Sequence, residues 1–211
     1  RMTYNSNHIE GSTLTEEQTR QIFETGNVGF NETFKVDDIV ETVNHFRAID
    51  YCIDIAEENL SEEIIKHFHY LLKRSTSDEM RAWFNVGEYK ERDNAIGAGA
   101  NIINTSSAKN VASDMSKLIE SYLSIENTSL DDIIKFHYEF EKIHPFQDGN
   151  GRVGRLIAFK ECLKHNVIPF IVEDSKKRFY YRGLQEYLRE PGYLIDTCYD
   201  GQDTMKKILD L

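Results

Sequence analysis

Cysteine and proline are scarce in this chain of 211 residues, which has three of each. Cys52, Cys162 and Cys198 are odd in number and widely spaced, and they form neither a CxxC pair nor a disulfide framework. Such cysteines are typical of buried thiols in a reducing compartment. The scarcity of proline and the lack of sustained strand-like alternation favour a mainly helical protein.

Long apolar runs and a net positive charge are also missing. No segment approaches the roughly 20 apolar residues that span a bilayer, and the N-terminus lacks the charged start and apolar stretch of a signal peptide. The formal net charge is -11, so the protein's own field opposes a broad grip on nucleic-acid phosphates. We therefore expect a cytoplasmic protein that binds neither membranes nor nucleic acid.

The composition instead indicates one substantial core. Hydrophobic residues make up 40% and charged residues 29% of the sequence, a balance typical of folded domains. One good-sized domain, with or without a small appendage, fits this length better than two equal domains. We expect an all-α fold.

Helix signals begin near the N-terminus. Thr15 and Gln18 form a capping box that predicts a short helix ending at Gly26, and residues 4–10 can form a further turn or two ended by Gly11. Asp37 or Asp38 can cap a long helix. Its expected inward stripe is Ile39, Val43, Phe46, Ile49 and Ile53. A helix starting at Ser61 has the stripe Ile64, Phe68, Leu71 and Leu72.

Residues 84–106 interrupt the helical pattern with glycines and asparagines, Gly87, Gly97 and Gly99 among them. The short apolar pieces Ala95-Ile96 and Ile102-Ile103 predict a small hairpin or a mobile loop. Helical spacing returns over residues 108–124 and after a second capping box, Ser129 with Asp132. That helix should end at His144, because Pro145 follows it. Further helices are expected from about Gly151, over 176–189 and over 193–210.

Residues 144–155, with the sequence HPFQDGNGRVGR, concentrate groups that perform chemistry. Gly149 and Gly151 allow a tight turn, and the free N–H groups at the start of the next helix form an anion site. Arg152 and Arg155 lie three residues apart, so both can reach one phosphate chain. The stretch therefore predicts a polyphosphate site.

Two further residues of this stretch add a metal ligand and a base. Asp148 would be repelled by phosphates unless a cation such as Mg2+ lay between them. His144 can accept a proton from an attacking hydroxyl near neutral pH. His67, His69 and His137 lack the HExxH spacing of a helical zinc site, and we interpret them as structural or surface residues.

HPFQDGNGRVGR resembles the signature HPFx(D/E)GNGRxxR of the Fic family at every specified position. The resemblance implies a helical catalytic core over residues 61–190, an N-terminal region over 1–60 and a C-terminal helix over 191–211 packed on the core. It implies an enzyme that transfers AMP from Mg2+-bound ATP to a Ser, Thr or Tyr hydroxyl of a target protein and to itself. The implied roles are general base for His144, Mg2+ ligand for Asp148, anion hole for Gly149, Asn150 and Gly151, and phosphate binding for Arg152 and Arg155.

The same resemblance implies where the other substrate groups bind. Relatives that phosphorylate have lysine at the position of Gly151, which favours AMP transfer here. Residues 85–104 resemble the flap that holds the backbone of the target protein in this family. Tyr180 or Tyr181 would lie near adenine, and the other would belong to the core.

A second motif, residues 6–11, fits the pattern (S/T)xxxE(G/N), which is the inhibitory motif of the family. A glutamate at the end of a helical turn is disfavoured by the helix dipole, so another group should hold Glu10. The family role is an ion pair with Arg155 that takes this arginine away from the γ-phosphate, while Ser6 fixes the inhibitory helix.

Two other functions compete with regulated AMP transfer. One is removal of AMP from a modified protein, with Glu10 positioning a water molecule. The other is a non-catalytic module that senses ATP, which needs neither the base His144 nor the metal ligand Asp148. The oligomeric state stays open, and a homo-oligomer is one possibility.

Overall fold

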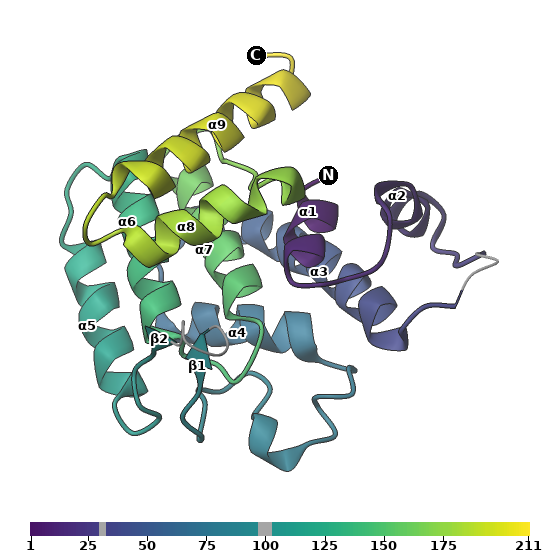
Figure 1. The fold of residues 1–211 in the computed structure, drawn as a ribbon, viewed down its shortest axis with the longest axis horizontal. Coiled ribbons are helices and arrows are strands. Elements are labelled where there is room, and N and C mark those ends of the chain that lie inside the picture. The colour runs from purple at the N-terminus through teal and green to yellow at the C-terminus, as the bar shows by residue number, and fades with distance from the viewer. Residues whose placement is uncertain (30–32, 97–102) are drawn as a thin grey trace.

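A computed structural model describes residues 1–29, 33–96 and 103–211, and the expected all-α architecture is confirmed (Figure 1). The helices in chain order are α1 (Met2–Ile9), α2 (Glu16–Thr25), α3 (Val36–Asp54), α4 (Glu62–Lys73), η1 (Ala82–Phe84), α5 (Val111–Leu123), α6 (Leu130–Ile143), α7 (Asn150–Lys164), η3 (Asp174–Lys176), α8 (Lys177–Glu186) and α9 (Gly192–Ile208). None of the helices within the described ranges is long and apolar enough to cross a membrane.

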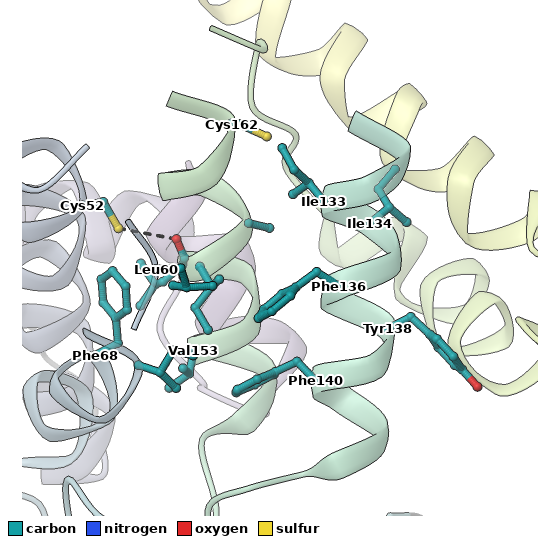
Figure 2. Packing of buried hydrophobic residues seen from close by; sticks show 14 of the residues in the cluster. Cys52, Leu60, Phe68, Ile133, Ile134, Phe136, Tyr138, Phe140, Val153 and Cys162 are labelled. Carbon is teal, nitrogen blue, oxygen red and sulfur yellow. Dashed lines mark hydrogen bonds between the residues drawn. The ribbon is translucent and has the colours of Figure 1, made fainter. Parts of the chain in front are cut away.

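The core lies around α6 and α7 (Figure 2). Phe136 and Phe140 of α6 point toward α7, while Tyr138 points away from it, toward the C-terminal helices. Phe68 comes from α4, and the Cys52 thiol of α3 donates to the Leu156 carbonyl oxygen at 3.5 Å. All three cysteines are buried and unpaired with one another, as expected from their spacing.

Both capping boxes form as the sequence predicts. The Thr15 side chain accepts from Gln18 N, and Gly26 ends α2 in the left-handed conformation with φ 66°. Ser129 and Asp132 exchange the same pair of hydrogen bonds at the start of α6. Local side-chain chemistry therefore determines where these two helices begin.

The predicted inward face of α3 is partly wrong, because Ile39, Val43, Phe46 and Ile49 are only half-buried. Ile53 is 58% exposed, whereas the buried side of the helix carries mainly polar residues. These are Asp38, Thr42, Asn44, His45, Ala48 and Cys52. Apolar periodicity failed because this face meets polar partners: Asn44 donates to the Leu72 and Arg74 carbonyls, at 3.1 and 2.7 Å.

The predicted cap of α3 is also wrong, because Lys35 is the N-cap residue and it makes no side-chain capping bond. The two aspartates of the first turn bond across the chain instead. Asp37 accepts from Ser77 N at 3.0 Å, and Asp38 accepts from Thr13 N at 3.0 Å. These carboxylates hold neighbouring segments against α3 while still lying at the favourable end of its dipole.

The segment between α4 and α5 contains the predicted hairpin. Strands β1 (Ala95–Ile96) and β2 (Ile103–Asn104) pair antiparallel, with Ala95 opposite Asn104 and Ile96 opposite Ile103. The expected Gly97, Gly99 and Ile102 lie outside the described residues.

Helix α1 is held by several elements of the fold. Thr3 Oγ1 lies 3.2 Å from His45 Nδ1, and Asn7 donates to Thr42 Oγ1 of α3 at 3.3 Å. On the opposite side, Asn5 Oδ1 accepts from Asp174 N at 2.9 Å. The N-terminal helix is therefore fixed to α3 and to the segment that precedes α8.

Candidate active site

His144 lies at the turn between α6 and α7. It ends α6 in the left-handed conformation, with φ 54° and ψ 61°, directly before Pro145. Its Nδ1 is 3.3 Å from the Glu141 carbonyl oxygen. A carbonyl only accepts, so Nδ1 carries the proton and Nε2 is the basic nitrogen.

The surroundings keep this imidazole neutral. Burial, followed by the nearby Lys90 ammonium, lowers the pKa of His144 to about 4. Glu141 Oε2 lies 4.0 Å from His144 Nδ1, and burial raises the pKa of Glu141 to about 8. His144 is consequently in its base form at neutral pH.

The glycine turn follows His144 and leads into α7. Gly149 has φ 80°, a conformation that a side chain would strain, and its peptide precedes the first turn of α7. The Asn150 amide braces the turn: its Oδ1 accepts from Phe146 N at 2.8 Å and its Nδ2 donates to Phe146 O at 2.9 Å. The unpaired N–H groups at the start of α7 thus face a turn of fixed shape, as an anion site requires.

Asp148 lies in a network of charges beside this turn. Its Oδ2 accepts from Lys73 Nζ at 2.8 Å and lies 3.5 Å from Arg152 Nη2. Burial alone would raise the pKa of Asp148, but Lys73 and Arg152 hold it well below its ordinary range. Arg152 also pairs with Glu41 of α3. Asp148 is therefore ionised, and 55% of its side chain is exposed toward solvent.

Lys73 and Glu41 were not predicted as members of this site. The Lys73 side chain is 2% exposed, and its Nζ also pairs with Glu41 and Asp78, each at 2.6 Å. Glu41, Asp78 and Asp148 are the one three-carboxylate cluster found within residues 1–29, 33–96 and 103–211, and Lys73 contacts every member. The sequence offered no signal for Lys73, because at helical spacing it lies away from the apolar stripe of α4.

Arg155 meets the N-terminal motif. Its Nη2 pairs with Glu10 Oε1 at 2.7 Å and donates to the Ser6 carbonyl at 2.9 Å, while its Nε donates to Ser6 Oγ at 3.1 Å. Burial alone would lower the pKa of Arg155, but Glu10 and its other acidic neighbours raise it. The ion pair expected between Glu10 and Arg155 is present.

Helix α8 closes the other side of the site. Tyr180 is 1% exposed, and its hydroxyl lies 2.7 Å from His137 Nε2 and 3.5 Å from Arg155 Nη1. Tyr181 is half-buried, and its hydroxyl lies 3.5 Å from the Ile9 carbonyl oxygen, to which Lys177 also donates. Of the two tyrosines, Tyr180 is the core residue, and Tyr181 is the more accessible.

The three histidines interpreted from the sequence as structural or surface residues have structural surroundings. His69 accepts from Gly87 N at 2.9 Å and stacks on Phe146 with ring centroids 4.1 Å apart. His137 is buried against Tyr180, and His67 packs on Tyr51 with ring centroids 4.7 Å apart. Burial lowers the pKa of both His69 and His137 to about 3, so both are neutral.

The His144 turn, the start of α7, helix α8 and the N-terminal motif surround a cavity of about 340 Å3. Its wall includes His144, Gly151, Arg155, Glu10 and both tyrosines of α8, and Ile96 of the hairpin closes one side. The cavity brings a neutral base and an arginine to the start of the anion-binding turn, and the ionised Asp148 lies beside that turn without lining the cavity. Such a set can bind a polyphosphate and accept a proton from a hydroxyl beside it.

Comparison with known proteins agrees with this geometry. Residues 59–161 match the model of the Fic/DOC family. A curated relative, protein adenylyltransferase Fic of Drosophila virilis, is 26% identical over 217 aligned residues, which cover 99% of this chain and 41% of the relative. Residues 59–161 of this chain therefore form a domain of the Fic/DOC family.

Solved structures share the fold. A Fic domain-containing signaling protein from Bacteroides thetaiotaomicron aligns with a TM-score of 0.80 at 22% identity, over 98% of this chain and 82% of the other. A Fic family protein from Desulfovibrio desulfuricans aligns with a TM-score of 0.78 at 25% identity, over 99% and 63%. The chain thus spans less than half the length of the curated relative and most of the length of the Bacteroides protein.

Proposed function

We propose that this protein transfers AMP from ATP to a Ser, Thr or Tyr hydroxyl of a target protein, and to itself. The observation that carries the proposal is the placement of the neutral base His144 directly beside the glycine turn, in the cavity that also contains Arg155. The adenylyltransferase name of the curated relative supports the same reaction.

Each group then has a defined task. The hydroxyl oxygen attacks the α-phosphorus, the bond from phosphorus to the pyrophosphate oxygen breaks, and His144 Nε2 takes the hydroxyl proton. Gly149, Asn150 and Gly151 shape the anion hole, and Arg152 and Arg155 neutralise phosphate charge. Tyr181 borders the adenine, and the hairpin within residues 85–104 holds the backbone of the target.

Asp148 is the residue we assign to Mg2+. Its carboxylate is ionised and half-exposed beside the anion-binding turn, which suits a metal that takes one or two carboxylates and completes its shell with water and phosphate oxygens. Bound Mg2+ would supply charge neutralisation on the phosphates. Lys73 holds one oxygen of Asp148, so the carboxylate cannot turn away from the site.

The N-terminal motif supplies inhibition in this proposal. While Glu10 pairs with Arg155, this arginine is not free to bind the γ-phosphate, and a Cβ at Gly151 would contact Glu10 Oε1. The carboxylate thus lies directly over the first turn of α7, where its charge opposes that of a phosphate. Ser6 holds the same arginine through two hydrogen bonds.

Substitution of Glu10 tests the proposal. We expect Glu10→Gly to raise incorporation of label from α-labelled ATP into the protein itself by about tenfold or more, since one charge–charge contact is worth that much in a buried site. His144→Ala in the Glu10→Gly background should abolish incorporation. Glu17→Gly, which alters an exposed glutamate of α2, is the matched control and should leave the basal rate unchanged.

Two outcomes would contradict the proposal. If Glu10→Gly incorporates no label with Mg2+ and ATP at millimolar concentration, AMP transfer is refuted. If the wild-type and Glu10→Gly proteins transfer at the same rate, AMP transfer stands and inhibition by the N-terminal motif is refuted.

A further inference from the structure

Lys90 lies between the hairpin and the His144 turn, and it is 3% exposed. Its Nζ donates to Asn94 Oδ1 at 2.6 Å and to Thr105 Oγ1 at 2.8 Å, which are the residues just before β1 and just after β2. The same Nζ lies 3.5 Å from the Ile143 carbonyl oxygen at the end of α6. One ammonium group therefore joins both legs of the hairpin to the residue preceding His144.

The backbone of the same two segments is joined as well. Lys90 N donates to the Pro145 carbonyl at 2.8 Å, and Asn94 Nδ2 donates to the Phe146 carbonyl at 3.0 Å. Thr105 Oγ1 in turn donates to the Asn94 carbonyl at 2.8 Å. These bonds surround His144 on both sides in the sequence, so the turn and the base of the hairpin form one hydrogen-bonded unit.

The Lys90 ammonium also acts on His144 through its charge. After burial, it is the largest influence that lowers the pKa of His144, whereas Asp148 and Glu10 act in the opposite direction. Glu141 is the remaining acidic side chain near the imidazole. Lys90 accordingly helps to keep Nε2 free to accept a proton.

We propose that Lys90 is a positioning residue that fixes the base of the hairpin relative to the His144 turn, so that a hydroxyl held along the hairpin faces Nε2. The inference rests on the proposed AMP transfer, because it assigns the hairpin to the substrate that carries the hydroxyl. Positioning errors of about 1 Å cost roughly a hundredfold in rate, which makes such a brace consequential.

The test compares Lys90→Met with Lys90→Arg in the Glu10→Gly background. Lys90→Met keeps the apolar stem and removes the ammonium, so we expect self-modification at saturating ATP to fall by about tenfold or more, while the Kd of ATP changes less than about threefold. Hydrogen exchange of residues 91–96 and 144–149 should rise, with exchange in α6 and α7 unchanged. Lys90→Arg keeps the charge and several donors and should recover part of the rate.

A control variant and a double-mutant cycle distinguish a positioning role of Lys90 from a general loss of structure. Lys66→Met, which removes an ammonium that pairs with Glu88 at 2.9 Å in the same region, should alter neither rate nor exchange. Lys90→Met and Thr105→Val should be non-additive, because both remove the same hydrogen bond.

Unchanged exchange in both segments of folded Lys90→Met would overturn the inference, even if transfer by the Glu10→Gly parent is intact. The same holds if Lys90→Met lowers ATP affinity as much as it lowers the rate, since the residue would then act on the nucleotide. Absence of transfer in the Glu10→Gly parent itself would instead refute the proposed function, and the exchange measurement would still report on the brace.

Discussion

The charged residues of the site differ in how far the sequence could predict them. His144, Asp148, Arg152 and Arg155 fall in one twelve-residue stretch, and their chemistry suggests phosphate binding and proton transfer without any structure. The contact of Arg155 with Glu10 joins positions 145 residues apart and was predicted only through the family motif.

Lys73, Glu41 and Lys90 were not predicted because no local pattern marks them. Each lies on a different segment, and each gains its importance from a partner distant in the chain. Lys73 and Asp148, for example, are 75 residues apart. A buried cation such as Lys73, which carboxylates from other elements stabilise, becomes visible only when the chain is folded.

The pKa of His144 makes a prediction about catalysis. Its pKa is lowered to about 4, so the base is unprotonated throughout the neutral range and loses activity only when the pH falls toward that value. Glu10 raises this pKa, so its removal should lower it further. We expect the acid limb of kcat for the Glu10→Gly variant to have its midpoint below about pH 5.5, measured at saturating Mg2+ and ATP. A midpoint near 6.5 would show an ordinary solvated histidine.

At the level of elements, capping residues and apolar stripes predicted most helices. Helix α4 begins after Ser61 and buries Ile64, Phe68, Leu71 and Leu72, as expected. The same reasoning was partly wrong for helix α3, because its buried side is mainly polar and forms hydrogen bonds with α1 and with the end of α4. A stripe of apolar residues predicts contact with apolar neighbours only, so a face that binds through hydrogen bonds escapes it.

The contact between α8 and α9 gives a prediction for stability. A Cβ at Gly183 would lie 2.7 Å from Leu194 Cα, a backbone atom that cannot move alone. Gly183→Ala should therefore lower the free energy of unfolding by about 1–3 kcal/mol, measured by urea denaturation. Since α8 carries Tyr181, the Kd of ATP should rise in the same variant.

Gly29→Ala is the matched control for this substitution. The nearest atom to its Cβ would be 3.6 Å away, an ordinary contact. We expect its free energy of unfolding to stay within about 0.5 kcal/mol of that of the parent protein. Equal free energies of unfolding for the Gly183→Ala and Gly29→Ala variants would show that α8 and α9 move apart to accept the added methyl group without loss of stability.

At the scale of the whole molecule, the fold class and the family were both accessible from the sequence. The hairpin was predicted from its two short apolar pieces, and the all-α architecture from the recurring helical spacing. The contact of the N-terminal motif with α7 was predicted through the family resemblance, but the association of α1 with α3 and α8 was not, because it depends on single polar contacts between distant segments.

Buried histidines give the whole protein a pH dependence. Burial lowers the pKa of His45, His69 and His137 to about 3 and that of His144 to about 4. Below pH 6.5 the unfolded chain therefore binds up to four protons that the folded protein excludes. The free energy of unfolding consequently decreases as the pH is lowered. Glu141, with its pKa raised to about 8, acts in the opposite direction, but it is one group against four.

We accordingly expect the Tm at pH 5 to be about 10 °C or more below the Tm at pH 7, measured by circular dichroism. His137→Phe should reduce this difference, because one of the four groups no longer titrates. A Tm independent of pH over this range would mean that these histidines are accessible to protons in the folded state.

The attachment of α1 on several sides has a consequence for timing. Its contacts are distributed over α3, α7 and η3, so loss of any one bond leaves the others to hold the helix in place. Departure of α1 is then a concerted, infrequent event. Under the proposed inhibition, Arg155 should stay paired with Glu10 for long intervals and be free for short ones, instead of being partly free at all times.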